Sequence, residues 1–275
     1  MKRTTRLLAM FAALALVLTA CGDDTGDGDD TDDGDGASTT AAAADFDLVA
    51  DGTLTVCTDA PYPPMEMEDP DAEGGYTGFD IELMRAIADD LGLELAVNNT
   101  GFDPITSGLA MEAGDCDVAA ASITITEERE ENIDFSEPYF SGDQSLLALE
   151  ESGLTALADF GGSSIAVQTG PTGEIYAQEN APDDAELVSF DDPGDMFLAL
   201  EAGNVQGVLQ DIVTNGDYAL NNEGASVVET YPTEEFYGFA VKEEGSEALL
   251  EAVNASLAKF QDDGTYDQIY ADWFE

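Results

Sequence analysis

From about residue 50 onward, hydrophobic and polar positions divide the chain into alternating strand-like and helix-like segments. Short apolar runs bounded by turn residues predict buried strands, and apolar residues at helical spacing predict helices. Strands are expected at 53–59, 93–97 and 118–121, and helices at 81–91 and 102–113. Strand, helix, strand, helix, strand in this order predicts a parallel sheet with right-handed crossovers.

A second series of the same kind follows a proline-interrupted extended stretch at 133–149. Strands are expected at 164–168, 186–190, 205–210 and 226–229, with helices beginning near Glu174, around Met196 and at Ile212. The tail, with a strand at 236–242 and helices at 248–260 and 266–274, is left to return to the first series. The pattern predicts an α/β fold of two lobes, each a parallel-rich sheet flanked by helices, with a ligand crevice between them. We assign residues 47–142 plus 234–275 to the first lobe and 143–233 to the second.

The amino terminus has the pattern of an export signal. Lys2, Arg3 and Arg6 precede the apolar run Leu7 to Leu18, and Leu-Thr-Ala-Cys follows, ending at Cys21. Residues 1–20 are therefore predicted to be a signal peptide, whose ending resembles that of a bacterial lipoprotein with Cys21 lipidated. A short membrane anchor is the alternative, but the run is too short to span comfortably. Residues 21–46 predict an extended acidic linker, so we expect a protein lipid-anchored on the outer face of the cell membrane.

The composition of the chain excludes several classes of function. The chain has 7 basic and 60 acidic residues, a formal net charge of −53, which repels nucleic acid and anionic lipid surfaces and suggests a high-salt habitat. Histidine is absent, which excludes Ser-His and Cys-His nucleophiles and His-containing zinc sites; no cofactor or metal is expected. Cys57 and Cys116 suggest a disulfide, with two buried thiols as the alternative.

Arg129 is the first candidate for ligand chemistry. It follows the strand at 118–121, and Thr126 is predicted to cap a helix that starts just before it. Open sheets bind ligands at the carboxyl ends of their strands, and a guanidinium matches a carboxylate in a bidentate pair. The alternative is that Arg129 pairs with neighbouring glutamates on a solvated helix.

Four spaced motifs carry a resemblance to a known family. They are Cys-Thr-Asp-Ala-Pro-Tyr-Pro-Pro at 57–64, Gly-Phe-Asp-Ile-Glu-Leu at 78–83, Ser-Ile-Thr-Ile-Thr-Glu-Glu-Arg at 122–129 with Phe-Ser-Glu-Pro-Tyr-Phe at 135–140, and Gln-Thr-Gly-Pro-Thr-Gly at 168–173. Over residues 50–275 the chain resembles a bacterial extracellular solute-binding protein of the amino-acid ABC-importer type, family 3. The resemblance implies a periplasmic-binding-protein-like Venus flytrap of type II. It also implies a monomer that binds a small molecule without catalysis and partners importer membrane subunits.

The resemblance also implies roles for individual residues. Arg129 clamps an α-carboxylate with Thr124 and a helix amide, Asp211 takes the α-ammonium, and two aromatic rings enclose the side chain. The implied ligand-binding set is Asp59, Tyr62, Phe102, Ala121, Ser122, Thr124, Arg129, Gln168, Thr172, Gly173, Gln210 and Asp211. For Asp211 the alternative is a plain helix cap, and for the aromatics an ordinary place in the core.

Asp59 points to the class of ligand. A carboxylate buried at the end of the first strand needs a partner, and Arg129 is already assigned to the α-carboxylate. Arginine, lysine and ornithine are therefore expected ahead of glutamine, since a cationic side chain between Tyr62 and Phe102 also gains cation–π attraction. The alternatives are an exported dehydratase-like enzyme using Asp59 as general acid or base, and a sensor module that docks on a receptor.

Overall fold

A computed structural model of the chain describes residues 46–275. The predicted signal peptide, the lipidation site Cys21 and the linker up to residue 45 lie outside the described residues. Within the described part, no helix is long and apolar enough to cross a membrane.

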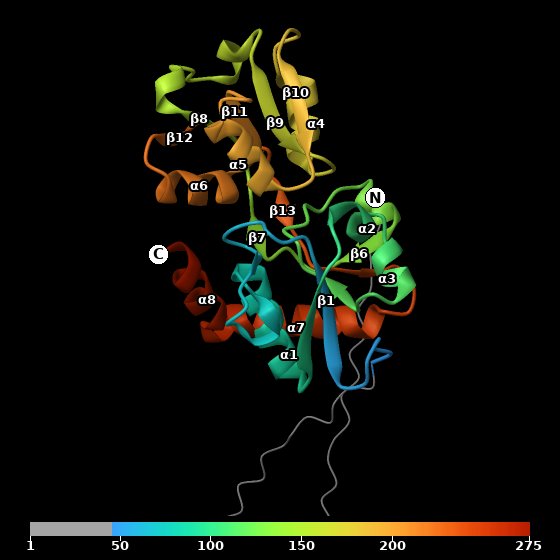
Figure 1. The fold of residues 1–275 in the computed structure, drawn as a ribbon. Coiled ribbons are helices and arrows are strands. Elements are labelled where there is room, and N and C mark those ends of the chain that lie inside the picture. Colours follow the sequence, from blue (N-terminus) through green and yellow to red (C-terminus); the bar gives the residue numbers. More distant parts are fainter. Residues whose placement is uncertain (1–45) are drawn as a thin grey trace, which may run out of the picture. The chain divides into compact units, whose positions relative to one another are not determined.

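The first lobe, which contains β1 and β6 in Figure 1, is built on a five-stranded sheet in the order β4-β1-β5-β14-β6. Strand β1 (Thr53–Thr58) pairs in parallel with β4 (Glu94–Asn99) and β5 (Val118–Ala119). Strand β14 (Ala240–Lys242) runs antiparallel to β5 and to β6 (Ile133–Phe135). The tail of the chain thus returns to the first sheet, as the sequence predicts.

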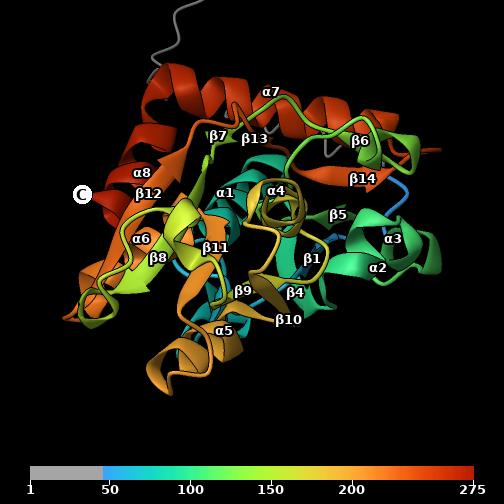
Figure 2. The ribbon, with the colours of Figure 1, turned by 90° about the horizontal axis from the view of Figure 1, so that it is seen from above.

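Helices of the first lobe supply its apolar core. Helix α1 (Phe79–Leu91) places Leu83, Met84 and Ile87 fully inside, and Gly92 ends it in the left-handed conformation. Helices α7 (Glu247–Asp263) and α8 (Thr265–Phe274) contact each other and α1 (Figure 2). Leu249, Val253 and Leu257 of α7, four residues apart in turn, share one core with the α1 side chains.

The second lobe is built on a sheet in the order β10-β9-β11-β8-β12. Strands β9 (Ser164–Gln168), β10 (Glu186–Phe190) and β11 (Gly207–Asp211) are parallel, while β8 (Gln144–Leu149) runs antiparallel to β11 and β12 (Ala225–Tyr231). Its helices are α4 (Thr172–Asn180), α5 (Pro193–Glu201) and α6 (Ile212–Asn221). Each follows a strand, so the strand ends deliver loops to one edge of the sheet.

The chain crosses between the lobes through two short antiparallel strands, β7 (Phe140–Ser141) and β13 (Phe236–Tyr237). The smaller elements are β2 (Met67–Glu68), β3 (Tyr76–Thr77), and the 3-10 turns at Glu73–Gly75, Arg129–Glu131, Glu150–Ser152 and Leu157–Phe160. The exact lobe boundaries at 142–143 and 233–234 stay a prediction.

Three segment predictions are wrong in detail, and two of them concern helices. No α-helix starts at Thr126; a single 3-10 turn forms at Arg129–Glu131, although the Thr126 hydroxyl oxygen does accept a hydrogen bond from the Arg129 amide at 3.3 Å. The helix predicted over 102–113 is two short ones, α2 (Phe102–Thr106) and α3 (Leu109–Ala113). Gly108 separates them with φ of 75°, where a Cβ would lie 2.8 Å from the Asn132 carbonyl oxygen.

The strand predicted over 236–242 is also divided, into β13 and β14. Gly238 lies between them, and a Cβ there would come 3.0 to 3.1 Å from Phe135 and Ile125. The predicted disulfide is confirmed: Cys57 of β1 and Cys116, just before β5, are bonded with their Cα atoms 5.5 Å apart. It ties together two strands that are neighbours in the sheet.

Candidate functional site

A small enclosed cavity lies between the strand ends of the two lobes. Its volume of about 10 Å³ has room for about one water molecule. Its lining contains every residue of the predicted ligand-binding set except Thr172, Gly173 and Gln210, together with Glu66 and Pro171, which the sequence did not indicate. The structure therefore brings most of the predicted residues to one place; their part in binding stays a proposal.

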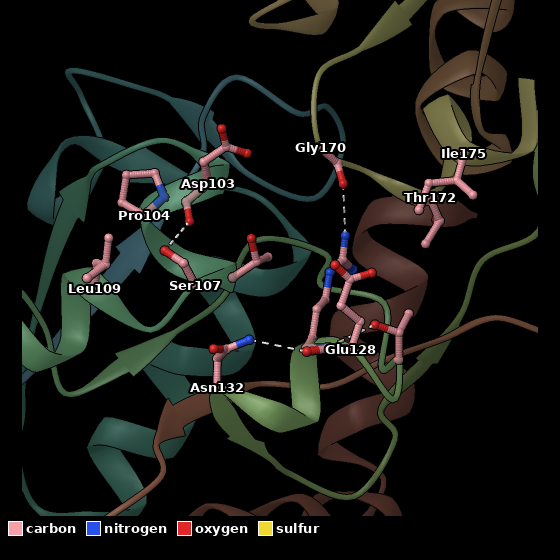
Figure 3. Close-up of a pocket in the computed structure, with 12 residues that line it drawn as sticks. Asp103, Pro104, Ser107, Leu109, Glu128, Asn132, Gly170, Thr172 and Ile175 are labelled. Atoms are coloured by element: carbon pink, nitrogen blue, oxygen red, sulfur yellow. Dashed lines mark hydrogen bonds between the residues drawn. The ribbon is translucent and has the colours of Figure 1, made fainter. Parts of the chain in front are cut away.

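Arg129 is buried at the edge of this cavity, with 8% of its surface exposed. Its guanidinium donates to the carbonyl oxygens of Thr124 at 2.8 Å and of Gly170, in the second lobe, at 3.3 Å (Figure 3), and lies 4.9 Å from the Phe102 ring centroid. Among the described residues no carboxylate lies within 4.0 Å of it. The alternative of a solvated ion pair with neighbouring glutamates is therefore wrong. Burial lowers the pKa of Arg129, and the negative charges of Asp211, Glu235 and Glu128 offset part of this effect.

Asp80 holds the loop that precedes Arg129. Ser122 has φ of 49°, and its amide donates to Asp80 Oδ2 at 2.9 Å. The Tyr139 hydroxyl donates to the same carboxyl group at 2.7 Å. Burial raises the pKa of Asp80 to about 7. Asp80 is not in the predicted ligand-binding set, although its place in the Gly-Phe-Asp motif at 78–80 is a signal that could have found it.

Asp59 and Gln168 join the lobes at the other side of the cavity. The Gln168 side-chain amide donates to Asp59 Oδ2 at 2.9 Å and to the Asp191 carbonyl oxygen at 3.1 Å. Burial raises the pKa of Asp59 to about 6, and the negative charge of Asp192 adds to this. The neutral amide supplies a hydrogen bond without a positive charge, so a cation remains the better partner for Asp59.

Glu66 adds a further carboxyl group to the cavity. Its side chain is 1% exposed and accepts a hydrogen bond from the Ser122 hydroxyl at 3.3 Å. Burial, followed by the nearby charge of Asp80, raises the pKa of Glu66 well above its usual range. In the sequence Glu66 is followed closely by Glu68 and Asp69, and nothing local distinguishes it from these neighbours.

Asp211 lies at the amino end of helix α6, but its side chain makes no capping hydrogen bond, so the alternative of a plain helix cap is wrong. The Tyr237 hydroxyl donates to Asp211 Oδ2 at 2.6 Å, and the Gln144 side-chain amide donates to Oδ1. Burial raises the pKa of Asp211 to about 6. The carboxyl group is directed to the cleft and to the crossing strand β13.

The remaining predicted residues divide between cleft and interior. Tyr62 and Phe102 are buried and line the cavity, and the Thr124 and Thr172 hydroxyl oxygens lie 3.4 Å apart across the cleft. Gly173 allows a close approach, since a Cβ there would meet Gln144 Oε1 at 2.8 Å. Gln210 turns inward instead, because its amide donates to Asn215 Oδ1 at 3.1 Å.

A larger pocket of about 470 Å³ adjoins the enclosed cavity (Figure 3). Asp103, Pro104 and Leu109 line it from the first lobe, and Thr172 and Ile175 from the second. Arg129 lines both spaces. The buried guanidinium is thus next to a pocket between the lobes that is large enough for a small molecule.

Comparisons with known proteins agree with this fold. The family model of the bacterial extracellular solute-binding proteins, family 3, matches residues 54–275. The ABC transporter glutamine-binding protein GlnH of Bacillus subtilis (strain 168) is 33% identical over 98% of this chain and 96% of its own length. An ancestral arginine-binding protein, solved with arginine and with glutamine, has a TM-score of 0.75 and 36% identity over 82% of this chain and 99% of its own.

A second solved structure is an ancestral amino acid-binding protein that is a precursor of cyclohexadienyl dehydratase. Its TM-score is 0.74, with 34% identity over 82% of this chain and 96% of its own. The fold and the cleft are those of a two-lobed solute-binding protein. This chain belongs to the bacterial extracellular solute-binding proteins, family 3.

Proposed function

We propose that the chain captures a polar or basic L-amino acid between its lobes and delivers it to the membrane subunits of an ABC importer. Arginine, lysine and ornithine are favoured ahead of glutamine. The observation that carries the proposal is an imbalance of charge in the lining of the cavity. Arg129 is its one basic residue, against the carboxyl groups of Asp59, Glu66 and Asp211.

A cationic amino acid corrects this imbalance. Its α-carboxylate pairs with Arg129, whose buried guanidinium has no carboxylate partner among the described residues. Its α-ammonium meets Asp211, and its side chain passes between Tyr62 and Phe102 to Asp59, with Glu66 close by. A ligand with an acidic side chain places a negative charge against carboxyl groups that already resist ionisation.

Binding requires the lobes to move. The cavity has room for about one water molecule, so an amino acid enters only when the lobes separate about the crossings near 140–148 and 230–236. A zwitterion that joins Arg129 of the first lobe to Asp211 of the second then stabilises the closed form. The importer recognises that closed form.

An exported dehydratase on the same scaffold is the second candidate. The observation that favours it is Asp59, whose pKa is raised to about 6 by burial and is suited to acid–base catalysis. We prefer binding because Asp59 is held by Gln168 at 2.9 Å and needs a cation to satisfy it. Incubation of the protein with candidate carboxylic acids and analysis for products distinguishes the two.

We further propose that the mature protein begins at a lipidated Cys21 and works as a monomer. The proposal rests on the signal pattern before Cys21 and on membership of an extracellular family. Metabolic labelling with a fatty acid, compared between the wild type and Cys21→Ser, tests the anchor.

The test of the ligand class is a thermal-shift screen against the twenty amino acids and ornithine, in high salt. A ligand that binds only the folded state at a hundred times its Kd stabilises it by about 2.7 kcal/mol. Arginine, lysine and ornithine are expected to raise Tm most and glutamine less. If glutamate or an aliphatic amino acid outcompetes all four, the proposed ligand class is wrong. The variant Asp59→Asn should lose the preference for arginine over glutamine.

A further inference from the structure

Glu235 lies on the second crossing, between β12 and β13, and reaches both lobes with one carboxylate oxygen. Its Oε2 accepts hydrogen bonds from the Thr172 hydroxyl at 2.6 Å, the Gln144 amide at 3.1 Å and the Thr124 hydroxyl at 3.2 Å. Thr124 belongs to the Arg129 loop of the first lobe, and the other two donors belong to the second lobe. The Glu235 carboxylate therefore lies between Thr124, which lines the enclosed cavity, and Thr172, which lines the larger pocket.

The backbone around Glu235 is built to hold this position. Glu234, just before it, has φ of 56°, a left-handed conformation that is unfavourable for a non-glycine residue. Asp143 Oδ1 accepts hydrogen bonds from the Thr233 amide at 3.1 Å and the Glu234 amide at 3.3 Å. The Glu235 carbonyl oxygen accepts from the Gly142 amide at 3.2 Å. A strained turn fixed from the first crossing thus places the Glu235 side chain.

Gln144 connects Glu235 to Asp211. Its side-chain nitrogen carries two hydrogens but faces three acceptors, namely Asp211 Oδ1, Glu235 Oε2 and the Thr172 hydroxyl. The two carboxyl groups therefore share one neutral amide. Among the described residues no lysine or arginine lies within 4.0 Å of either carboxyl group.

Two adjacent carboxyl groups that share a single amide lack positive charge. An ammonium group has three hydrogens and a full charge, and it satisfies two carboxylates better than one amide can. The two carboxyl groups also repel each other. Burial is the main cause of the raised pKa of Asp211, and the negative charge of Glu235 raises it further. The guanidinium of Arg129 is near enough for the charges of Asp211 and Glu235 to raise its pKa against burial, but it lies more than 4.0 Å from both carboxyl groups and makes its hydrogen bonds to backbone carbonyls.

We propose that Glu235 and Asp211 together form the binding site for the ligand's α-ammonium group, with Glu235 as a second carboxylate supplied from the crossing. This inference rests on the proposed function and deepens it. It makes the α-amino group the point where both lobes and the crossing meet. Carboxylic acids without an α-amino group therefore gain nothing from Glu235.

The experiment is a cycle of two proteins and two ligands, measured by calorimetry. The wild type and Glu235→Gln are titrated with L-arginine and with 5-guanidinopentanoate, which has hydrogen in place of the α-amino group. Glutamine keeps the shape of Glu235 and an acceptor oxygen, so the fold is retained. Loss of one charged hydrogen-bonding partner is expected to weaken arginine binding by at least about tenfold. Binding of the des-amino analogue should change by no more than about twofold.

Glu234→Gln is the matched control, because it removes the same charge from the exposed neighbouring residue. Both affinities should stay at the wild-type value. An equal loss for both ligands in Glu235→Gln would assign Glu235 a structural role and overturn the proposal. A gain in arginine affinity would also overturn it, since Glu235 would then compete with the ligand carboxylate for Thr124 and Thr172.

If the ligand screen selects another amino acid, that amino acid and its des-amino analogue enter the same cycle. A wild type that binds no amino acid contradicts the proposed function itself.

Discussion

The two lobes face the same cleft but support it with different interiors. Behind the binding loop of the first lobe lie two buried carboxyl groups, Glu66 and Asp80, and the latter fixes the Ser122 backbone. Behind the corresponding strand ends of the second lobe lie neutral groups. The Asn215 amide donates to the Ser145 hydroxyl at 2.9 Å and carbonyl oxygen at 3.3 Å, and Ser145 donates to the Gln210 carbonyl oxygen at 3.0 Å.

This difference matters because a carboxyl group is far more costly to bury than an amide or a hydroxyl. The geometry of the first lobe therefore depends on protonation, while that of the second does not, apart from Asp211. The first lobe also contains the Cys57–Cys116 disulfide, and no disulfide lies in the described part of the second. We infer that the first lobe is the charged, cross-linked half that selects the ligand, and that the second closes over it.

The largest expected effect comes from Arg129→Ala, which removes the only positive charge of the cavity lining. Leaving the ligand carboxylate without its charged partner should cost about 2–5 kcal/mol, a loss of roughly 30-fold to several thousand-fold in affinity. In the second lobe, Thr172→Ala removes only a neutral hydroxyl and should cost about 1 kcal/mol. Calorimetry with L-arginine measures both.

Arg85→Ala is the control for this comparison, because Arg85 lies on α1 and pairs with Glu82 at 3.4 Å, outside the cavity lining. It should bind arginine as the wild type does. A smaller loss for Arg129→Ala than for Thr172→Ala would reverse the assignment of ligand selection to the first lobe.

The second effect is on stability and concerns the disulfide. It joins residues 59 apart, and a cross-link of that span removes about 4 kcal/mol of chain entropy from the unfolded state in the entropic model. Replacing both Cys57 and Cys116 with serine should lower hydrogen-exchange protection in β1, β4 and β5 more than in β9 and β11. An equal fall in hydrogen-exchange protection in both lobes would mean that they unfold as one unit. The disulfide would then not distinguish the first lobe from the second.

The strands were within reach of the sequence because their signals are local, and the disulfide because Cys57 and Cys116 are the only cysteines after Cys21. Runs such as Val118 to Ala121 and Ile165 to Val167 are apolar throughout, which is typical of strands covered on both faces. Arg129 stood out because it is one of four basic residues after the signal segment. The wrong predictions arose where tertiary contacts outweigh local preference, as at Gly108, whose close approach to Asn132 divides a helix.

The part of the site that the sequence missed depends on contacts between distant segments. Glu66 is 56 residues from Ser122, and Glu235 is 111 residues from Thr124. The chain has 60 acidic residues, so its composition does not distinguish these two glutamates from the acidic residues exposed to solvent. Burial distinguishes Glu66, and hydrogen bonds to both lobes distinguish Glu235; neither property has a local pattern.

Two smaller expected effects test the charged interior of the first lobe through pH. Asp59 has its pKa raised to about 6 and Asp80 to about 7, both by burial, so the folded state binds more protons than the unfolded state near neutral pH. The free energy of unfolding of the ligand-free protein should therefore rise as pH falls from 7 to 5. For Asp59 alone the gain is on the order of 1 kcal/mol. Chemical denaturation at the two pH values measures it, and Asp59→Asn should show a smaller rise than Asp262→Asn, an exposed control on α7.

Binding of a cationic ligand should respond to pH in the opposite direction. The ligand pairs with ionised Asp59, and a group with pKa near 6 takes up a competing proton below that value. Arginine affinity should therefore fall by about tenfold between pH 7 and pH 5 for this one group, with proton release on binding near pH 6. Asp211, also raised to about 6 by burial, adds a similar decrease from the second lobe. Asp59→Asn should retain only the Asp211 part of the decrease. An unchanged decrease in that variant would place the pH dependence in the second lobe and contradict the contrast between the two interiors.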